Sequence, residues 1–286
     1  MKVLLKELLQ VFKFNLASTA NFVLLSLCLS TQAADKLAIN LSGEVKQGGL
    51  MVGKTAANNT VMLNDQPLKV SVTGDYAFGF SRDDNNTYQL VITDSQGNKV
   101  EKTLKPAPQK YNIQRVNGIK KAIMNPNVKA QTRSKKDSAQ IKAIREISSD
   151  LNAFAQGFIP PIDGVITGVY GSQRFYNGVP KSPHYGLDYA GKIGDPVKAP
   201  ANGVILLWVP DMFYSGGTMV IDHGHGISST FLHLSKSYVQ VGDEVKQGQV
   251  VAAVGNSGRT TGPHLDWRIN WHQMRLDPAL ALKINQ

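Results

Sequence analysis

Five of the six histidines lie between residues 184 and 264, at positions 184, 223, 225, 233 and 264. Asp188 follows the first of these by four residues, and Asp266 follows the last by two. Imidazole and carboxylate are zinc ligands in proteins, and thiolate is the third common donor. The single cysteine, Cys28, lies in an apolar N-terminal stretch, so a metal bound to this chain would be held by histidine and carboxylate. No nucleophile elbow for a Ser-His-Asp arrangement is apparent in the sequence, which makes metal chemistry the first hypothesis.

The elements expected to position these residues are strands, in which side chains two or four residues apart point to the same face. His184 and Asp188 would then face together, because Pro183 and the glycine between the pair favour extended structure. His264 and Asp266 would also share a face. The pair of His184 and Asp188 taken alone is weak evidence, and a structural histidine beside a solvated aspartate would be the better interpretation of it.

A third segment, Thr-Phe-Leu-His-Leu at 230–234, supplies His233. Strand alternation predicts that Phe231 and His233 point to the same face. Three separate segments would each direct a metal-binding or proton-binding side chain toward one surface, which a purely structural interpretation does not explain. His223 and His225 are interpreted as structural or cleft-lining residues.

Three motifs, taken in order, resemble those of peptidase family M23, the lysostaphin-like or LytM zinc metallopeptidases. They are H-Y-G-L-D at 184–188, D-H-G-H-G-x-x-S-T-F-L-H-L at 222–234 and G-x-x-G-x-T-T-G-P-H-L-D-W at 255–267. The resemblance runs from about Ile162 to Pro278, and the combination is far more specific than any single fragment.

The resemblance implies roles for five residues. The zinc ligands of the family fall on His184, Asp188 and Asp266, and its catalytic histidines fall on His233 and His264. Two positions depart from the family pattern: Phe231 stands where the family usually has tyrosine, and Asp266 stands where it usually has histidine. A ligand set of one histidine and two aspartates is still compatible with zinc, but it carries one more negative charge and leaves a less electrophilic ion.

The function implied by the resemblance is that of a zinc metalloendopeptidase that hydrolyses peptide cross-links of bacterial peptidoglycan. The alternative is a catalytically inactive LytM-like module that binds the wall and activates a partner hydrolase. Four of the five site positions keep the family residue, which favours the enzyme. A wall-binding role remains open for the first half of the chain.

Residues 1–33 are predicted to be a secretory signal peptide that is cut after Ala33. Lysines precede the apolar run at 22–29, whose eight residues would cover about 12 Å as a helix, against roughly 30 Å of hydrocarbon in a bilayer. A membrane anchor is therefore the less favoured alternative, and no other stretch approaches a membrane span. The protein is expected in the periplasm or outside the cell, with the periplasm of a Gram-negative bacterium favoured.

The net charge of +10 is concentrated in one segment. Residues 102–145 carry twelve lysines and arginines and one acidic residue, Asp137. Such a segment could bind an anionic wall polymer or membrane surface, or it could be a solvated linker. Nucleic acid is not expected as a partner, because no aromatic stacking platform accompanies the charges and the protein is predicted to be exported.

The chain of 286 residues is long enough for two ordinary domains, and its pattern predicts a mainly β protein. Short strand-like runs separated by turn residues predict a small antiparallel β-sandwich-like domain at 34–104. A basic connector with one helix follows at 105–160. Strands separated by Gly-rich turns predict an antiparallel β domain of LytM peptidase type at 161–286.

The helix is predicted over residues 138–155, from apolar residues that recur every three or four positions. These residues are Ile141, Ile144, Ile147, Leu151 and Phe154. The resulting stripe is expected to pack on the domain that follows it.

Overall fold

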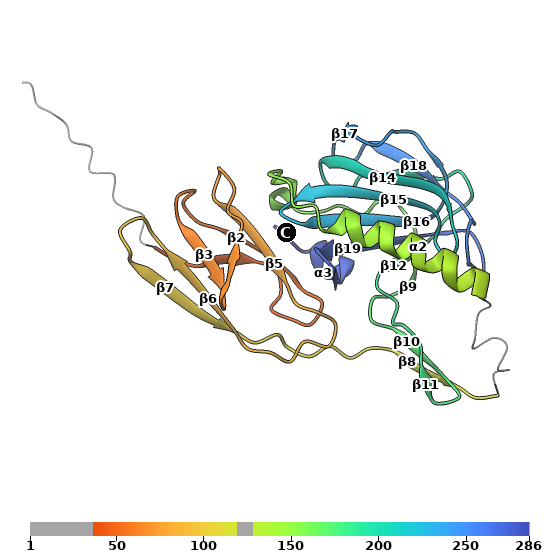
Figure 1. Cartoon of the computed structure of the whole chain (residues 1–286), viewed down its shortest axis with the longest axis horizontal. Coiled ribbons are helices and arrows are strands. Elements are labelled where there is room, and N and C mark those ends of the chain that lie inside the picture. Colours follow the sequence, from red (N-terminus) through yellow and green to blue (C-terminus); the bar gives the residue numbers. More distant parts are fainter. Residues whose placement is uncertain (1–36, 119–127, 286) are drawn as a thin grey trace, which may run out of the picture. The chain divides into compact units, whose positions relative to one another are not determined.

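The computed structural model describes residues 37–118 and 128–285 and shows a mainly β protein (Figure 1). The predicted fold class of small N-terminal antiparallel sheets, one connecting helix and a large C-terminal antiparallel sheet is confirmed. The predicted signal peptide at 1–33 lies outside the described residues. Within the described ranges, no helix combines the length and the apolar character needed to cross a membrane.

Between residues 37 and 104, all of which are described, the chain forms two antiparallel sheets, with strand orders β1-β2-β5 and β4-β3-β6-β7. Alternation builds their shared core: in β6, Leu90 and Ile92 are fully buried, whereas Gln89 is exposed and Val91 is partly exposed. The strands are β1 (Asn40–Ser42), β2 (Leu50–Lys54), β3 (Thr60–Leu63), β4 (Gln66–Leu68), β5 (Asp75–Gly79), β6 (Tyr88–Thr93) and β7 (Lys99–Leu104).

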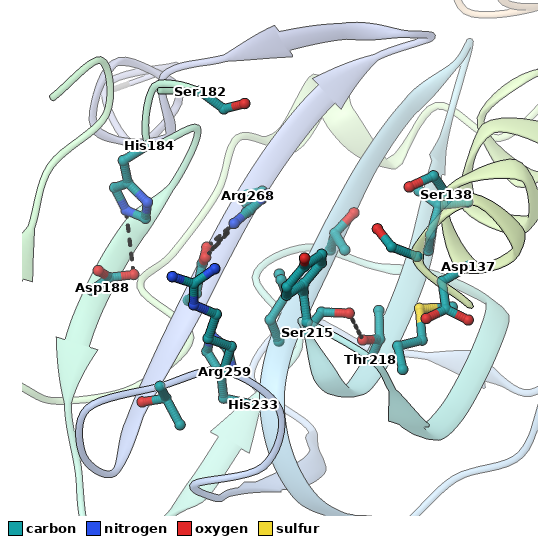
Figure 2. Close-up of a pocket in the computed structure, with 18 of the residues that line it drawn as sticks. Asp137, Ser138, Ser182, His184, Asp188, Ser215, Thr218, His233, Arg259 and Arg268 are labelled. Atoms are coloured by element: carbon teal, nitrogen blue, oxygen red, sulfur yellow. Dashed lines mark hydrogen bonds and ion pairs between the residues drawn. The ribbon is translucent and has the colours of Figure 1, made fainter. Parts of the chain in front are cut away.

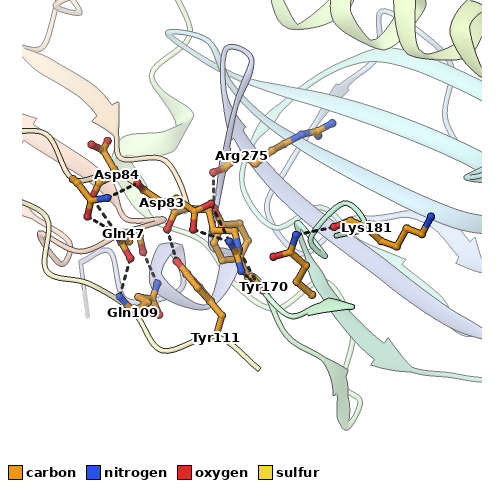
Figure 3. Close-up of polar contacts among 12 residues, drawn as sticks. Gln47, Asp83, Asp84, Gln109, Tyr111, Tyr170, Lys181 and Arg275 are labelled. Atoms are coloured by element: carbon orange, nitrogen blue, oxygen red, sulfur yellow. Dashed lines mark hydrogen bonds and ion pairs between the residues drawn. The ribbon is translucent and has the colours of Figure 1, made fainter. Parts of the chain in front are cut away.

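The start of the connector is bonded to both halves of the chain (Figure 3). The backbone N–H of Gln109 donates to Gln47 Oε1 at 3.0 Å, and the Tyr111 hydroxyl donates to the Arg82 carbonyl at 2.8 Å. The Arg82 guanidinium in turn donates to the carbonyl of Gly171 at 2.6 and 3.0 Å. Strand β8 (Ile113–Val116) then pairs in parallel with a strand of the C-terminal domain. This part of the connector is therefore structured, although β8 is exposed along its whole length.

The connecting helix α2 spans Val128–Arg145, which differs from the predicted 138–155. Only Ile141 and Ile144 of the predicted stripe lie on it, packed against the C-terminal domain. Ile147 and Leu151 are 42% and 36% exposed, and Phe154 is buried through a separate turn of 3₁₀ helix, η1 (Ala153–Gln156). The chain leaves α2 before Ser148-Ser149-Asp150, residue types whose side chains compete for backbone hydrogen bonds and favour turns over helix interiors.

In the C-terminal domain, whose residues 161–285 are all described, the main sheet has the strand order β17-β14-β15-β16-β19-β12-β9. Outside this order, β18 pairs with β13 and β16, β20 pairs with β19, and β10 and β11 form a small sheet with β8. The elements are β9 (Ile166–Gly168), β10 (Gln173–Tyr176), β11 (Val179–Pro180), β12 (Leu187–Ala190), β13 (Pro196–Lys198), β14 (Gly203–Met212), β15 (Gly216–Gly224), β16 (Ile227–Ser237), β17 (Glu244–Val245), β18 (Val250–Val254), β19 (His264–Trp271), β20 (Met274–Leu276) and α3 (Pro278–Ala281).

The two faces of this sheet have different roles. Met219 and Ile221 of β15 point into the main core, whereas Val220 between them points to the opposite face, where it packs with Ile141 and Ile144 of α2. Helix α2 therefore covers part of the face that lies away from the main core. Because β19 lies between β16 and β12 in the sheet, the three segments singled out by the sequence are neighbours on that face.

Candidate active site

A groove of about 960 Å³ opens on the sheet face that carries α2 (Figure 2). Figure 2 shows His184 and Asp188 on one side of the view and Asp137 and Ser138 of α2 on the other. All five residues that the sequence singled out line this groove, namely His184, Asp188, His233, His264 and Asp266. The fold thus brings together residues that are up to 82 positions apart in the chain.

His184, Asp188 and Asp266 form a group of possible metal ligands, with one donor atom from each lying within 4.8 Å of the others. Asp188 on β12 and Asp266 on β19 are directly paired in the antiparallel register, so both carboxylates leave the sheet on the same side. His184 lies in the loop before β12, where its backbone N–H donates to the Ser172 carbonyl and its carbonyl accepts from Gly171, both at 2.8 Å. The predicted convergence of His184 and Asp188 is therefore present, although His184 lies in a loop and not on the expected strand.

Two atoms of this group are buried without a hydrogen-bond partner anywhere in the described part of the chain. They are His184 Nε2 and Asp188 Oδ1, which lie at an ion-pair distance of 3.2 Å from each other (Figure 2). Leaving such polar atoms unsatisfied is costly, and natural proteins rarely do so without a ligand or a functional reason. One imidazole and two carboxylates are suitable donors for zinc, so the residues fit a zinc ion.

Two glycines let the carboxylates lie directly against bare backbone. A Cβ atom at Gly186 would lie 2.4 Å from Asp266 Oδ1, and one at Gly168 would lie 2.2 Å from Asp188 Oδ2. Both distances are far below van der Waals contact. Any side chain at either position would therefore displace a carboxylate of the candidate metal group.

Asp266 has a partner that the sequence analysis missed. Arg268 donates to both oxygens of its carboxylate, from Nε at 2.9 and 3.1 Å and from Nη2 at 2.5 Å. Burial alone would raise the pKa of Asp266, but the guanidinium beside it holds this pKa below its ordinary value. His264, Asp266 and Arg268 occupy alternate positions of β19, so the same alternation that predicted the first two could have found the third.

The two remaining histidines present the same ring nitrogen to the groove. His233 Nδ1 lies 2.8 Å from the Ser257 carbonyl, and His264 Nδ1 lies 2.8 Å from the Gly262 carbonyl. Because a carbonyl can only accept, each Nδ1 carries the proton in the neutral ring and each Nε2 is left as a base. The ring centroids are 4.7 Å apart, and His264 Nε2 lies 4.0 Å from Asp188 Oδ1. Burial lowers the pKa of His233, which favours its neutral form.

His233 reaches the groove by a route that simple alternation does not predict. Phe231 is fully buried in the main core, whereas Leu232 and His233 both line the groove. The prediction that Phe231 and His233 share a face is therefore wrong. His233 has a φ of 63°, in the left-handed region, and this break in the strand turns its side chain toward the groove. Strained backbone of this kind is often found at functional sites.

His223 and His225 lie apart from the groove. His223 is fully buried, with its two ring nitrogens 2.7 Å from the Asn202 carbonyl and 2.9 Å from Ser229 Oγ. His225 packs on the ring of Phe154 at 4.9 Å between centroids. Neither residue lines the groove, which agrees with the structural interpretation and leaves His223 unable to complete a metal site there.

Comparisons with known proteins identify the family of this domain. The model of the family described as Peptidase family M23 matches residues 182–278. Peptidoglycan DD-endopeptidase ShyA of Vibrio cholerae is 39% identical over 104 residues, which are 36% of this chain and 23% of that protein. DD-carboxypeptidase/endopeptidase Mpg of Neisseria meningitidis is 42% identical over 96 residues, which are 34% of this chain and 22% of that protein. The matched part is thus less than a quarter of the length of either curated relative.

A solved structure extends the likeness beyond this domain. The crystal structure of a putative peptidase M23 from Pseudomonas aeruginosa has a TM-score of 0.62 and 25% identity to this chain, and the match covers 84% of this chain and 96% of that one. The site geometry and the family match agree on the same residues of the C-terminal sheet. The chain therefore belongs to peptidase family M23, with a lysostaphin/LytM-like domain that contains residues 182–278.

Proposed function

We propose that this chain is a zinc metalloendopeptidase that hydrolyses peptide cross-links of peptidoglycan in the envelope of a Gram-negative bacterium. One observation carries the proposal: three metal-competent side chains and two imidazoles, each held through Nδ1 by a backbone carbonyl, line one open groove. The relatives named as a peptidoglycan DD-endopeptidase and as a DD-carboxypeptidase/endopeptidase, both from Gram-negative species, support the substrate and the location.

In this proposal, His184, Asp188 and Asp266 hold the ion. When bound, zinc supplies Lewis acidity for the peptide carbonyl and lowers the pKa of an attacking water. The Nε2 atoms of His233 and His264 accept the proton from water, and a protonated ring then donates to the oxygen on which negative charge develops. The backbone carbonyls that hold each Nδ1 orient both rings for this task.

Arg268 is expected to compensate for the aspartate at the third ligand position. Its charge offsets that of Asp266, so the set of His184, Asp188, Asp266 and Arg268 has the same net charge as a His-Asp-His set. Loss of a group that orients a metal ligand typically lowers metal affinity or activity about 10- to 100-fold. We therefore expect Arg268→Met to lower zinc affinity by about this factor, as measured by competition with a chelator.

The double variant Asp266→His/Arg268→Met restores the charge balance and is expected to bind zinc more tightly than Arg268→Met alone. Lys142→Met, which removes an exposed charge from α2, serves as the control for a general charge effect. Unchanged zinc affinity in Arg268→Met would show that Arg268 does not support the ligand.

The proposal is tested with the purified chain from residue 34 onward, by measuring its zinc content and its digestion of isolated sacculi with product masses. An inactive module that activates a partner hydrolase would release no products unless that hydrolase were added. The buried His184 Nε2 and Asp188 Oδ1, which make no hydrogen bond in the described part of the chain, favour the enzyme because a bound metal ion would satisfy both atoms.

The basic segment at 102–145 is proposed to add affinity for anionic wall polymers. Lys102, Lys105, Lys129 and Lys136 are exposed, whereas Lys120 and Lys121 lie outside the described residues. Binding to sacculi should weaken markedly between 0.01 and 0.15 M salt, as the Debye length falls from about 30 to about 8 Å. Co-sedimentation of the protein with sacculi across this range measures the effect. Binding that does not respond to salt would contradict wall adhesion through this segment.

A further inference from the structure

The groove contains a second cluster of charged residues beside the candidate metal group. Arg145 comes from the last turn of α2, Arg268 from β19 and Arg275 from β20, and all three line the groove. Among the described lining residues, five are arginines and three are aspartates. The groove is therefore cationic even when the two candidate ligands Asp188 and Asp266 are counted.

Arg145 is buried without a partner. Its residue is 7% exposed, its Nε is buried without a hydrogen-bond partner in the described ranges, and no carboxylate there forms an ion pair with its guanidinium. Ile141, one helical turn earlier, packs α2 onto the sheet and so holds the Arg145 side chain at the groove. Charged side chains are almost never buried to this extent unless they are paired. The missing partner of Arg145 is therefore a group that this part of the chain does not supply.

Arg275 also has no carboxylate partner in the described part of the chain. Its Nη1 donates to Asn270 Oδ1 at 2.8 Å, and its carbonyl accepts from the Tyr170 hydroxyl at 2.9 Å (Figure 3). Of the three guanidiniums, only Arg268 has its charge matched, by Asp266. The charges of Arg145 and Arg275 are thus left without a carboxylate partner in the groove that also contains the candidate metal group.

The electrostatics of the cluster favour a bound anion. Burial, together with the charges of Arg275 and Arg268, lowers the pKa of Arg145 to about 8. Burial and the charge of Arg268 lower the pKa of Arg275 to about 9. A carboxylate placed between these guanidiniums would oppose both effects, since an opposite charge nearby stabilises the charged form.

We propose that Arg145 and Arg275 form a subsite for a free carboxylate of the substrate peptide next to the bond that is cut. Guanidinium groups match carboxylates in shape and bind them by charge-assisted hydrogen bonds. In a D,D cross-link, the carbon that bears the acylated nitrogen also bears a free carboxylate, whereas a residue inside a glycine bridge has none. The subsite therefore selects cross-links with a carboxylate on the amine side. This inference rests on the proposed function.

The test compares two substrates of the zinc-loaded full chain: a D,D-cross-linked muropeptide dimer, and the same dimer with the carboxylate beside the scissile amide converted to a carboxamide. The parent protein is expected to prefer the acid by about 10- to 100-fold in kcat/KM, the range of a hydrogen bond to a charged group. Arg145→Met and Arg275→Met should each reduce this ratio toward one by slowing hydrolysis of the acid. Lys142→Met, with an exposed lysine on the same helix, should keep the parent ratio.

Arg145→Met keeps an apolar stem and removes an unpaired buried charge, so it should fold, and thermal unfolding checks this. A second measurement, titration of both dimers into zinc-free protein, separates the subsite from the activity. Binding that prefers the acid and depends on Arg145, without hydrolysis by the loaded parent, would support the subsite and contradict the proposed function. If the parent hydrolyses both dimers, and Arg145→Met and Arg275→Met keep its acid-to-carboxamide ratio of kcat/KM, the subsite is overturned. The proposed function would still hold.

Discussion

Replacement of His184 or Asp188 by alanine is expected to abolish both zinc binding and peptide hydrolysis. These two residues supply the buried atoms without a partner, His184 Nε2 and Asp188 Oδ1, so each substitution removes a donor that no neighbour can replace. Enzymes accelerate their reactions by about 10⁶-fold or more, and loss of the ion should therefore take hydrolysis of sacculi below detection. Zinc per chain after dialysis and the release of soluble muropeptides measure the two effects.

The same variants make a prediction about stability. A ligand that binds only the folded state stabilises it, by about 4 kcal/mol at a free concentration one thousand times its Kd. Zinc should therefore raise the Tm of the parent protein but leave that of His184→Ala unchanged. His272→Ala, which replaces a half-buried histidine outside the groove, is the matched control and should respond to zinc like the parent. Full zinc occupancy in His184→Ala would end the assignment of this metal group.

Replacement of His233 or His264 by alanine is expected to leave zinc bound while lowering kcat by about a hundredfold or more, the usual contribution of a general base or an oxyanion donor. Both rings are anchored through Nδ1 to backbone carbonyls and present Nε2 to the groove, the arrangement of a proton acceptor. Zinc content and single-turnover rates on a muropeptide dimer separate metal loss from slower chemistry.

The pair also predicts non-additivity. With ring centroids 4.7 Å apart, the two histidines act on the same proton and the same oxygen, so the double variant should lose less than the product of the two single losses. Loss of zinc from His264→Ala would instead mean that His264 is a ligand. Its Nε2 lies 4.0 Å from Asp188 Oδ1, close enough for both atoms to bind one ion. Asp266 would then be only the partner of Arg268.

The sequence was sufficient for features that depend on neighbours along the chain. In β19, His264 and Asp266 line the groove while Leu265 and Trp267 are fully buried, as alternation predicts. The burial of one face of a strand makes its period of two visible in the sequence, so the facing of its side chains can be predicted. The resemblance to family M23 then assigned these residues to one site.

The tertiary structure decided what depends on distant contacts. The apolar period at 141–154 predicted one helix, but Ile141 lies on α2 and Phe154 in η1, because each is buried by a different part of the protein. Likewise, the positive φ of His233 interrupts the strand alternation, and no residue type in that strand predicts it. The site of Arg145 depends on where α2 packs, and its closeness to Arg275 depends on the pairing of β20 with β19. Packing between segments far apart in the chain places these residues. A local sequence pattern depends only on neighbouring residues and therefore cannot predict such contacts.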